Sequence, residues 1–320
     1  MIPAVSATSA AGAGGLSYQW VAVGDSGNLY TSTSTTLATG SWTSRTSSFG
    51  TTQIRAVASN ALTLYVAVGN SGKLASSPDG ITWTQRTSQF STDDIYDIAY
   101  GNGVWVAVGS AGKISTSTDG EIWTARTSGT ATRLVSIAYG NGVWVAGGES
   151  GVLRTATDPT STWTSRTSTI TNSVFTYYAP SQAIWLAGSD VGTTGALASS
   201  TDAVTWTART APFTMAGATP LNSPGFASTN SIIVLTQTTN YLTPSCDVGS
   251  STNGTTWTDR APATTAEQML GCCVDDTGTF AVTGLNNFQY STNGTTWTNG
   301  GTVPFSLLDM CHSAGTPSIR

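Results

Sequence analysis

Charged side chains are scarce in this sequence. Only 9% of its 320 residues are Asp, Glu, Lys or Arg, whereas an ordinary soluble domain contains about 25%. The 12 basic residues are outnumbered by 17 acidic ones, so the chain lacks the positive charge that would bind nucleic acid or an anionic membrane. Its surface must be solvated by hydroxyl and amide groups instead, and the chain contains 58 Thr and 40 Ser.

Histidine, glutamate and cysteine are also scarce, which limits the available chemistry. His312 is the one histidine, and a Ser-His-Asp triad would have to be built on it. Three glutamates leave little material for hydrolysis by paired carboxylates. We expect the cysteines to be reduced rather than part of a disulfide framework, because all of them lie in the last quarter of the chain. They are Cys246, Cys272, Cys273 and Cys311.

Long apolar segments and targeting signals are missing as well. The longest apolar runs, such as 232–235, fall far short of the roughly 18 residues that a membrane span requires. The first residues lack the basic and apolar regions of a secretory signal. We therefore expect neither membrane insertion nor a signal peptide. The abundant Thr, Ser and Gly are poor helix formers, which favours an all-β protein.

The sequence repeats with a period near forty. The string Ile-Ala-Tyr-Gly-Asn-Gly-Val-Trp-Val-Ala occupies 98–107 and again 137–146. A second motif, Ser/Thr-x-Asp/Asn-Gly-x-x-Trp-Thr, occurs with some variation seven times. Its tryptophans are spaced by 41, 40, 40, 43, 51 and 40 residues and are Trp42, Trp83, Trp123, Trp163, Trp206, Trp257 and Trp297. Such periods indicate stacked supersecondary units.

Each repeat contains four short segments with the composition of strands. In one repeat they are 95–100, 104–108, 113–118 and 122–127, which are rich in Val, Ile, Thr and Trp and separated by Gly-containing turns. Four strands in about forty residues are typical of a propeller blade. Seven copies predict an all-β fold, a seven-bladed β-propeller of four-stranded blades.

The two ends of the chain indicate how the ring closes. Segment 18–24 matches the second strand of a blade, and segment 307–311 matches a first strand. We expect the C-terminal strand to pair with the N-terminal blade, which removes an open sheet edge. Residues 1–15, rich in Ala, Ser and Gly, are predicted to be a flexible N-terminal arm, and residues 16–320 a single propeller domain.

The tryptophan motif resembles the Asp-box, or BNR repeat, of sialidase-type propellers, as in Ser-Pro-Asp-Gly-Ile-Thr-Trp at 77–83. Together with Gly-Asn-Gly-Val-Trp-Val-Ala-Val-Gly at 101–109, it also resembles propellers of the photosystem II stability/assembly-factor kind. Similar arrays occur in bacteriophage structural and tail-fibre proteins. The resemblance implies the fold for roughly 18–313, but it implies little about function because propellers have many activities.

The motif residues are predicted to have structural roles. An Asp or Asn before Gly can accept backbone N–H bonds in a tight turn, and we assign this role to Asp79, Asp119, Asn253 and Asn293. The tryptophan that follows would fill the space against the adjacent blade. A row of tryptophans that stack on carbohydrate is the alternative, but repetition in nearly every blade favours a core.

The arginines give no sign of an enzyme active site. Six of them follow a motif tryptophan by three residues, so they would lie on the outer strands of six blades and could not converge on one substrate; they are Arg45, Arg86, Arg126, Arg166, Arg209 and Arg260. The other four, Arg55, Arg133, Arg154 and Arg320, show no common position. The cysteines and His312 lack the paired spacing of a zinc site. We predict no catalytic residue, metal or cofactor.

Three insertions interrupt the repeat, at 189–195, 211–224 and 237–244. All belong to the fifth and sixth blades and would emerge on one face, and insertions of this kind often form binding surfaces. They offer polar and aromatic side chains as candidate binding residues, namely Phe213, Met215, Asn222, Asn240 and Tyr241. Neutral variation of surface loops is the alternative.

Composition and resemblance together favour a non-enzymatic virion protein of a bacteriophage, in a tail, a fibre or a capsid decoration. Its partners would be other virion proteins, bound through the 1–15 arm, and a host surface glycan or receptor. The alternative is a cellular assembly or scaffold factor of the photosystem-factor kind. A sialidase-like glycosidase is a third hypothesis, which the dispersed arginines disfavour.

Overall fold

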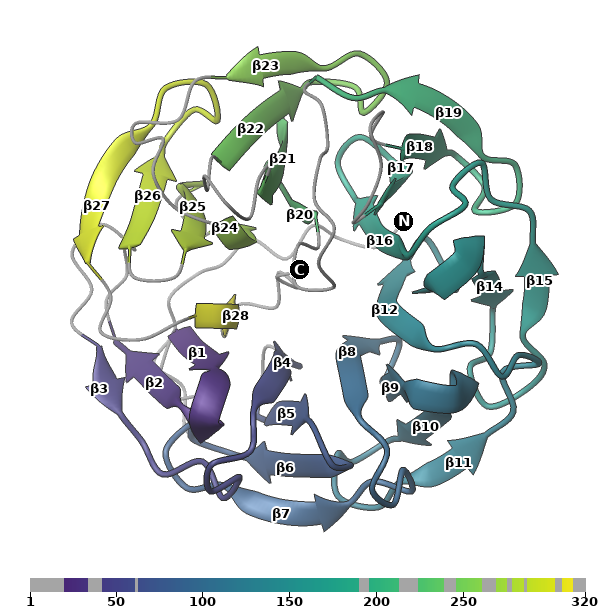
Figure 1. Ribbon diagram of the computed structural model, residues 1–320, viewed down its shortest axis with the longest axis vertical. Coiled ribbons are helices and arrows are strands. Elements are labelled where there is room, and N and C mark those ends of the chain that lie inside the picture. The colour runs from purple at the N-terminus through teal and green to yellow at the C-terminus, as the bar shows by residue number, and fades with distance from the viewer. Residues whose placement is uncertain are drawn as a thin grey trace.

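The computed structural model describes residues 20–33, 42–60, 63–189, 196–212, 224–238, 246–260, 269–274, 278–284, 287–302 and 307–312. Within these ranges the strands form seven four-stranded antiparallel sheets arranged as the blades of a ring (Figure 1). The predicted seven-bladed β-propeller is therefore confirmed. None of the described residues belongs to a helix that is long and apolar enough to cross a membrane.

Blades 1 to 4 contain the first half of the chain and one strand from its end. In order from the inside of the ring, blade 1 has β28 (Leu307–His312), β1 (Trp20–Gly24), β2 (Leu29–Ser32) and β3 (Thr43–Ser44). Blade 2 has β4 (Ile54–Ser59), β5 (Tyr65–Gly69), β6 (Lys73–Ser77) and β7 (Thr84–Thr87). Blade 3 has β8 (Ile95–Gly101), β9 (Val104–Gly109), β10 (Ile114–Ser117) and β11 (Thr124–Arg126). Blade 4 has β12 (Leu134–Gly140), β13 (Val143–Gly148), β14 (Leu153–Ala156) and β15 (Thr164–Arg166).

Blades 5 to 7 continue the ring with the same strand order. Blade 5 has β16 (Val174–Ala179), β17 (Ile184–Ser189), β18 (Ala196–Ser200) and β19 (Thr207–Thr210). Blade 6 has β20 (Gly225–Ser228), β21 (Ile233–Thr238), β22 (Cys246–Ser251) and β23 (Thr258–Arg260). Blade 7 has β24 (Met269–Val274), β25 (Phe280–Gly284), β26 (Asn287–Ser291) and β27 (Thr298–Thr302).

The strand from the end of the chain completes the first blade. Strand β28 pairs antiparallel with β1, with Trp20 opposite His312 and Val23 opposite Asp309. It thus occupies the innermost position that β4 and β8 occupy in blades 2 and 3. The predicted range of the propeller domain begins and ends outside the described residues, and the predicted 1–15 arm also lies outside them.

The hydrophobic core lies between the blades. An aromatic side chain on the second strand is almost completely buried in six blades, with at most 1% exposed; these side chains are Trp20, Tyr65, Trp105, Trp144, Trp185 and Phe280. One cluster joins Val21 and Leu29 of blade 1 to Tyr65 and Trp83 of blade 2. Because apolar side chains lie on both faces of each blade, every sheet is stabilised by its two neighbours.

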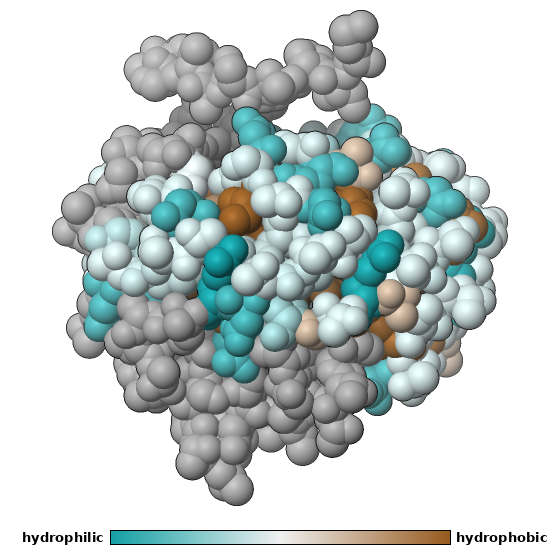
Figure 2. Space-filling model, turned by 90° about the horizontal axis from the view of Figure 1, so that it is seen from above, coloured by the Kyte–Doolittle hydropathy of each residue, from teal (hydrophilic) through white to brown (hydrophobic). Residues whose placement is uncertain are grey.

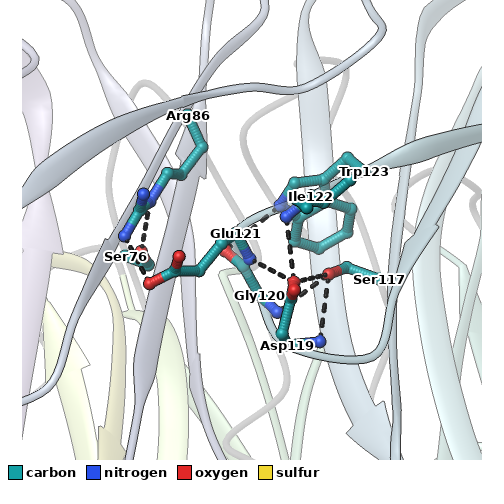
Figure 3. Close-up of polar contacts among 8 residues, drawn as sticks. All are labelled: Ser76, Arg86, Ser117, Asp119, Gly120, Glu121, Ile122 and Trp123. Carbon is teal, nitrogen blue, oxygen red and sulfur yellow. Dashed lines mark hydrogen bonds and ion pairs between the residues drawn. The ribbon is translucent and has the colours of Figure 1, made fainter.

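The tryptophan motifs form turns between the third and fourth strands. In blade 3 the Asp119 carboxylate accepts backbone N–H bonds from Glu121 and Ile122 at 2.8 and 2.9 Å, while Ser117 Oγ accepts one from Gly120 at 2.8 Å (Figure 3). The turns at Asp79, Asp202, Asn253 and Asn293 repeat this pattern. These bonds satisfy the backbone donors that the chain reversal leaves unpaired.

The motif tryptophans differ in burial around the ring. Trp83, Trp123, Trp163 and Trp206 are buried, whereas Trp42, Trp257 and Trp297 are half-buried. In the buried group the indole N–H donates to a carbonyl of the turn, as from Trp83 to Gly80 at 2.9 Å. The four buried tryptophans belong to the blade-to-blade core rather than to an exposed stacking row.

The ring has two faces, which we name by their connections. The connection face carries the links from second to third strand and from each blade to the next. The motif face carries the turns from first to second strand and the tryptophan motifs. On the connection face the short links are tightly packed: a Cβ added at Gly72, whose φ is +65°, would lie 2.0 Å from the Ser91 carbonyl oxygen. Glycine is therefore required there, and the link has little freedom to move.

Candidate functional site on the connection face

The insertions in the sequence predicted five candidate binding residues. Phe213, Met215, Asn222, Asn240 and Tyr241 all lie outside the described residues. These residues stay a prediction. The part of the chain that the structure describes offers a different site, in the regular blades 2 to 4.

This site begins with a bulge that recurs at the start of the innermost strands. The pairing of β4, β8 and β12 with the next strand shifts by one residue at Arg55, Tyr96 and Val135. A β-bulge turns its extra side chain away from the regular alternation of the strand. Each of the three is the second residue of its strand, at the end that begins on the connection face, and β4, β8 and β12 are innermost strands of the ring (Figure 1).

Two guanidinium groups meet at the ring of Tyr96. The Arg55 Cζ lies 4.5 Å from the centroid of that ring, and the Arg133 Cζ lies 5.0 Å from it. Arg133 directly precedes β12, so the two arginines come from blades 2 and 4 and the tyrosine from blade 3. Both distances are within the range of cation–π attraction, which lessens the repulsion between the two positive groups.

Polar contacts extend from this cluster across four blades. Arg133 forms an ion pair with Glu149 at 2.9 Å. Arg55 lies 3.9 Å from Asp94, and its Nε donates to Asn70 Oδ1.

The chain of contacts continues into blade 1. Asn70 Nδ2 donates to Gln53 Oε1 at 3.3 Å, and Gln53 Nε2 donates to Asp25 of blade 1. The site is thus held by neighbours in several blades rather than by one loop.

Burial gives Arg55 an unusual electrostatic environment. Its side chain is 15% exposed, and desolvation lowers its pKa, assisted by Arg133 and opposed by Tyr96 and Asp94. An arginine stays protonated even so. Among the described residues the Nη groups of Arg55 have no hydrogen-bond acceptor, because Asp94 is beyond hydrogen-bond distance. The site can therefore still donate to a carboxylate or another oxyanion.

The interpretation of the arginines from the sequence was partly wrong. Arg55 and Arg133 were assigned no common position, yet they share one aromatic ring. They are 78 residues apart, and they converge because each lies at or next to the first residue of an innermost strand. The only indication in the sequence that they occupy related positions was their separation of about two repeats.

The six arginines that follow a motif tryptophan by three residues, which we call the rim arginines, lie on or directly after the outermost strands of six blades. Each donates its Nε to a hydroxyl of the third strand at 2.7–2.9 Å; the acceptors are Thr31, Ser76, Thr116, Thr155, Ser199 and Ser250. Arg86 also reaches Glu121 of the next blade at 2.7 Å (Figure 3). These arginines bind within and between blades and do not converge on a site.

Other chemistry-bearing side chains form no cluster in the described part of the chain. Cys272 and Cys273 are buried and form no disulfide with a described residue, and burial raises the pKa of Cys272. The described residues contain no group of three or more side chains suited to hold a metal ion. In the edge-on view the described surface is mostly pale or teal with separate brown areas (Figure 2), consistent with a surface solvated by hydroxyl groups.

Comparison with known proteins supports the fold. A model of the DUF6242 beta propeller domain matches residues 5–128. No curated protein sequence matches the chain.

Several solved structures are similar in fold at low sequence identity. A structure described as YCF48 bound to D1 peptide is 15% identical with a TM-score of 0.59, over 84% of this chain and 86% of that one. YCF48 from Cyanidioschyzon merolae is 16% identical with a TM-score of 0.58, over 80% of this chain and 86% of that one. Virginiamycin B lyase from Staphylococcus aureus is 13% identical with a TM-score of 0.64, over 77% of this chain and 83% of that one. Identities this low show the fold alone.

Proposed function

We propose that the protein is a non-enzymatic assembly or scaffold factor that binds an acidic segment of a partner protein at Arg55, Tyr96 and Arg133. The observation that carries this proposal is the convergence of two guanidiniums on one aromatic ring. Arginine and tyrosine are the side chains that most often dominate protein interfaces. The tightly packed links of this face would hold them in place before binding, which lowers the entropic cost of association.

The comparisons favour this assembly-factor hypothesis over the virion role. One similar propeller is described as bound to a D1 peptide, so a ring of this kind can bind a peptide. The similar structures described above do not point to a phage particle, and the expected virion partners and host glycan gain no support from them. The lyase neighbours are enzymes by name, but the low identity carries no activity over to this chain.

The proposal is tested by peptide binding to the full-length protein. Short peptides rich in Asp and Glu, and matched peptides with Asn and Gln, are titrated in fluorescence anisotropy. We expect only the acidic set to bind. The double variant Arg55→Ala, Arg133→Ala should weaken binding roughly tenfold or more, because hydrogen bonds to charged groups contribute about 1.5–3 kcal/mol each.

A matched control removes the same charge elsewhere. The double variant Arg126→Ala, Arg166→Ala also loses two guanidiniums, but from the rim, where each donates to a hydroxyl of its own blade. It should bind the acidic peptides as the wild type does. If both double variants bind the acidic peptides equally weakly, the loss of affinity reflects net charge alone. If the Arg55→Ala, Arg133→Ala variant binds them as the wild type does, the proposed site is refuted.

A further inference from the structure

Three tyrosines lie at equivalent positions in consecutive blades, on the motif face of the ring, and we call them the arc. Tyr100, Tyr139 and Tyr178 lie near the ends of β8, β12 and β16, on the motif face. Each is paired across the sheet with the second-strand tryptophan of its blade, and the ring centroids are 4.8, 4.9 and 4.9 Å apart. Blades 2 and 6 have Ser59 and Ser228 at this position, so the arc covers only blades 3 to 5.

The tyrosine rings have a structural role that their hydroxyls do not share. A Cβ added at Gly101 would lie 2.3 Å from the Tyr139 ring, and one at Gly140 would lie 2.1 Å from the Tyr178 ring. Each of these two rings therefore packs between a glycine of the preceding blade and a tryptophan of its own. Phenylalanine would fill that space equally well, so packing does not explain why all three residues are tyrosines.

The hydroxyls of the arc make no hydrogen bond to any described residue, unlike a neighbouring tyrosine. Tyr177, which is buried, shares a hydrogen bond of 2.9 Å with Ser228 Oγ. The three residues of the arc are half-buried, so each is partly exposed to solvent. Burial raises the pKa of Tyr178, which keeps its hydroxyl a neutral donor and acceptor.

The turns that adjoin the arc are polar and uncharged. Asn102 and Asn141 are exposed at the tips of the adjoining turns, with φ of +48° and +47°. The turns 101–103, 140–142 and 180–183 contain no Asp, Glu, Lys or Arg. A charged ligand would find no counter-charge there, whereas hydroxyls and amides can pair with the hydroxyls of a sugar.

We propose that Tyr100, Tyr139 and Tyr178, with Asn102 and Asn141, bind a neutral oligosaccharide on the motif face. Each tyrosine is related to the next by the same step from blade to blade, so equivalent donors recur along the arc. A ligand built from identical units can meet such donors in the same way at each step. This site is independent of the arginine site, which lies at the other end of the innermost strands, on β4, β8 and next to β12.

The test uses the full-length protein and neutral hexasaccharides of glucose, mannose, galactose and N-acetylglucosamine, measured by calorimetric titration. We expect at least one to bind with little dependence on salt. The triple variant Tyr100→Phe, Tyr139→Phe, Tyr178→Phe should bind at least about tenfold more weakly, since it loses one hydrogen-bonding hydroxyl at each of three positions. Its melting temperature should be unchanged because the rings still pack.

Two further variants complete the design. Asn102→Gly with Asn141→Gly keeps the positive φ that glycine readily adopts and should also weaken binding. Tyr96→Phe removes a hydroxyl from the connection face and should leave sugar binding unchanged. The proposal is overturned if none of the four sugars binds, or if the triple variant binds as the wild type does. The Arg55→Ala, Arg133→Ala variant should still bind sugar, so failure of one proposal does not imply failure of the other.

Discussion

Strand β8 has a tyrosine near each end, and the two ends differ in chemistry. On the connection face Tyr96 lies between two guanidiniums. On the motif face Tyr100 packs on a tryptophan next to a turn without charged residues. The strand residues between them are fixed by the blade-to-blade core. The comparison shows that one repeat can present two unrelated surfaces, because the core constrains the middle of each innermost strand and leaves its ends free to vary.

The largest expected effect comes from opening the ring. Deleting residues 307–320 removes β28 and exposes the edge of β1 in blade 1, and an exposed edge promotes aggregation. We expect the truncated protein to aggregate or to lose cooperative unfolding. Both the arginine site and the tyrosine arc should then lose their ligands together. Calorimetry and light scattering measure this. A soluble truncated protein with an unchanged melting transition would show that the ring does not depend on β28.

A core substitution should lower stability but should affect neither of the two proposed binding sites. Trp123 is 3% exposed and packs with Val66 of blade 2 and Trp105 of its own blade. Trp123→Ala should reduce the free energy of unfolding by about 3–5 kcal/mol, as large-to-small core changes do. Denaturant titration measures the loss. Binding per folded molecule at either site should be retained, and loss of a ligand at unchanged stability would mean that this tryptophan is a contact residue.

Acid should weaken the aspartate turns of the motif face but not its asparagine turns. Backbone N–H bonds from Thr205 and Val204 lower the pKa of Asp202 to about 2. A lowered folded pKa means that the stabilisation is present above the unfolded pKa near 4 and is lost as pH falls through about 2. Asn253 accepts the same bonds but does not titrate.

Amide proton shifts measured by NMR test this difference within one molecule. Those of Val204 and Thr205 should titrate with the Asp202 carboxyl, whereas those of Thr255 and Thr256 should stay constant. The Asp202→Asn variant should remove the titration. Equal shifts at both turns would mean that acid disturbs the blades as a whole.

The sequence predicted the repeated parts of the molecule well. The seven blades follow from the spacing of the tryptophans, and the turn at Asp119 forms as expected because its residues are adjacent in the chain. The site at Arg55 and Arg133 was missed because it depends on a bulge and on the meeting of three blades. The insertions at 189–195, 211–224 and 237–244 stand out in the sequence by their length, whereas the arginine site keeps the length of the repeat and differs only in residue type.

The pairing of β28 with β1 also has a consequence for the order of folding. Trp20 and His312 are opposite each other although 292 positions separate them in the chain. Contacts over such separations form late, because a long loop must close before they stabilise anything. During synthesis blades 2 to 7 can each form from consecutive strands, while β1 lacks its inner neighbour until β28 has been made. Among the described strands of the ring, β1 is synthesised first and is therefore among the last to gain both of its neighbours.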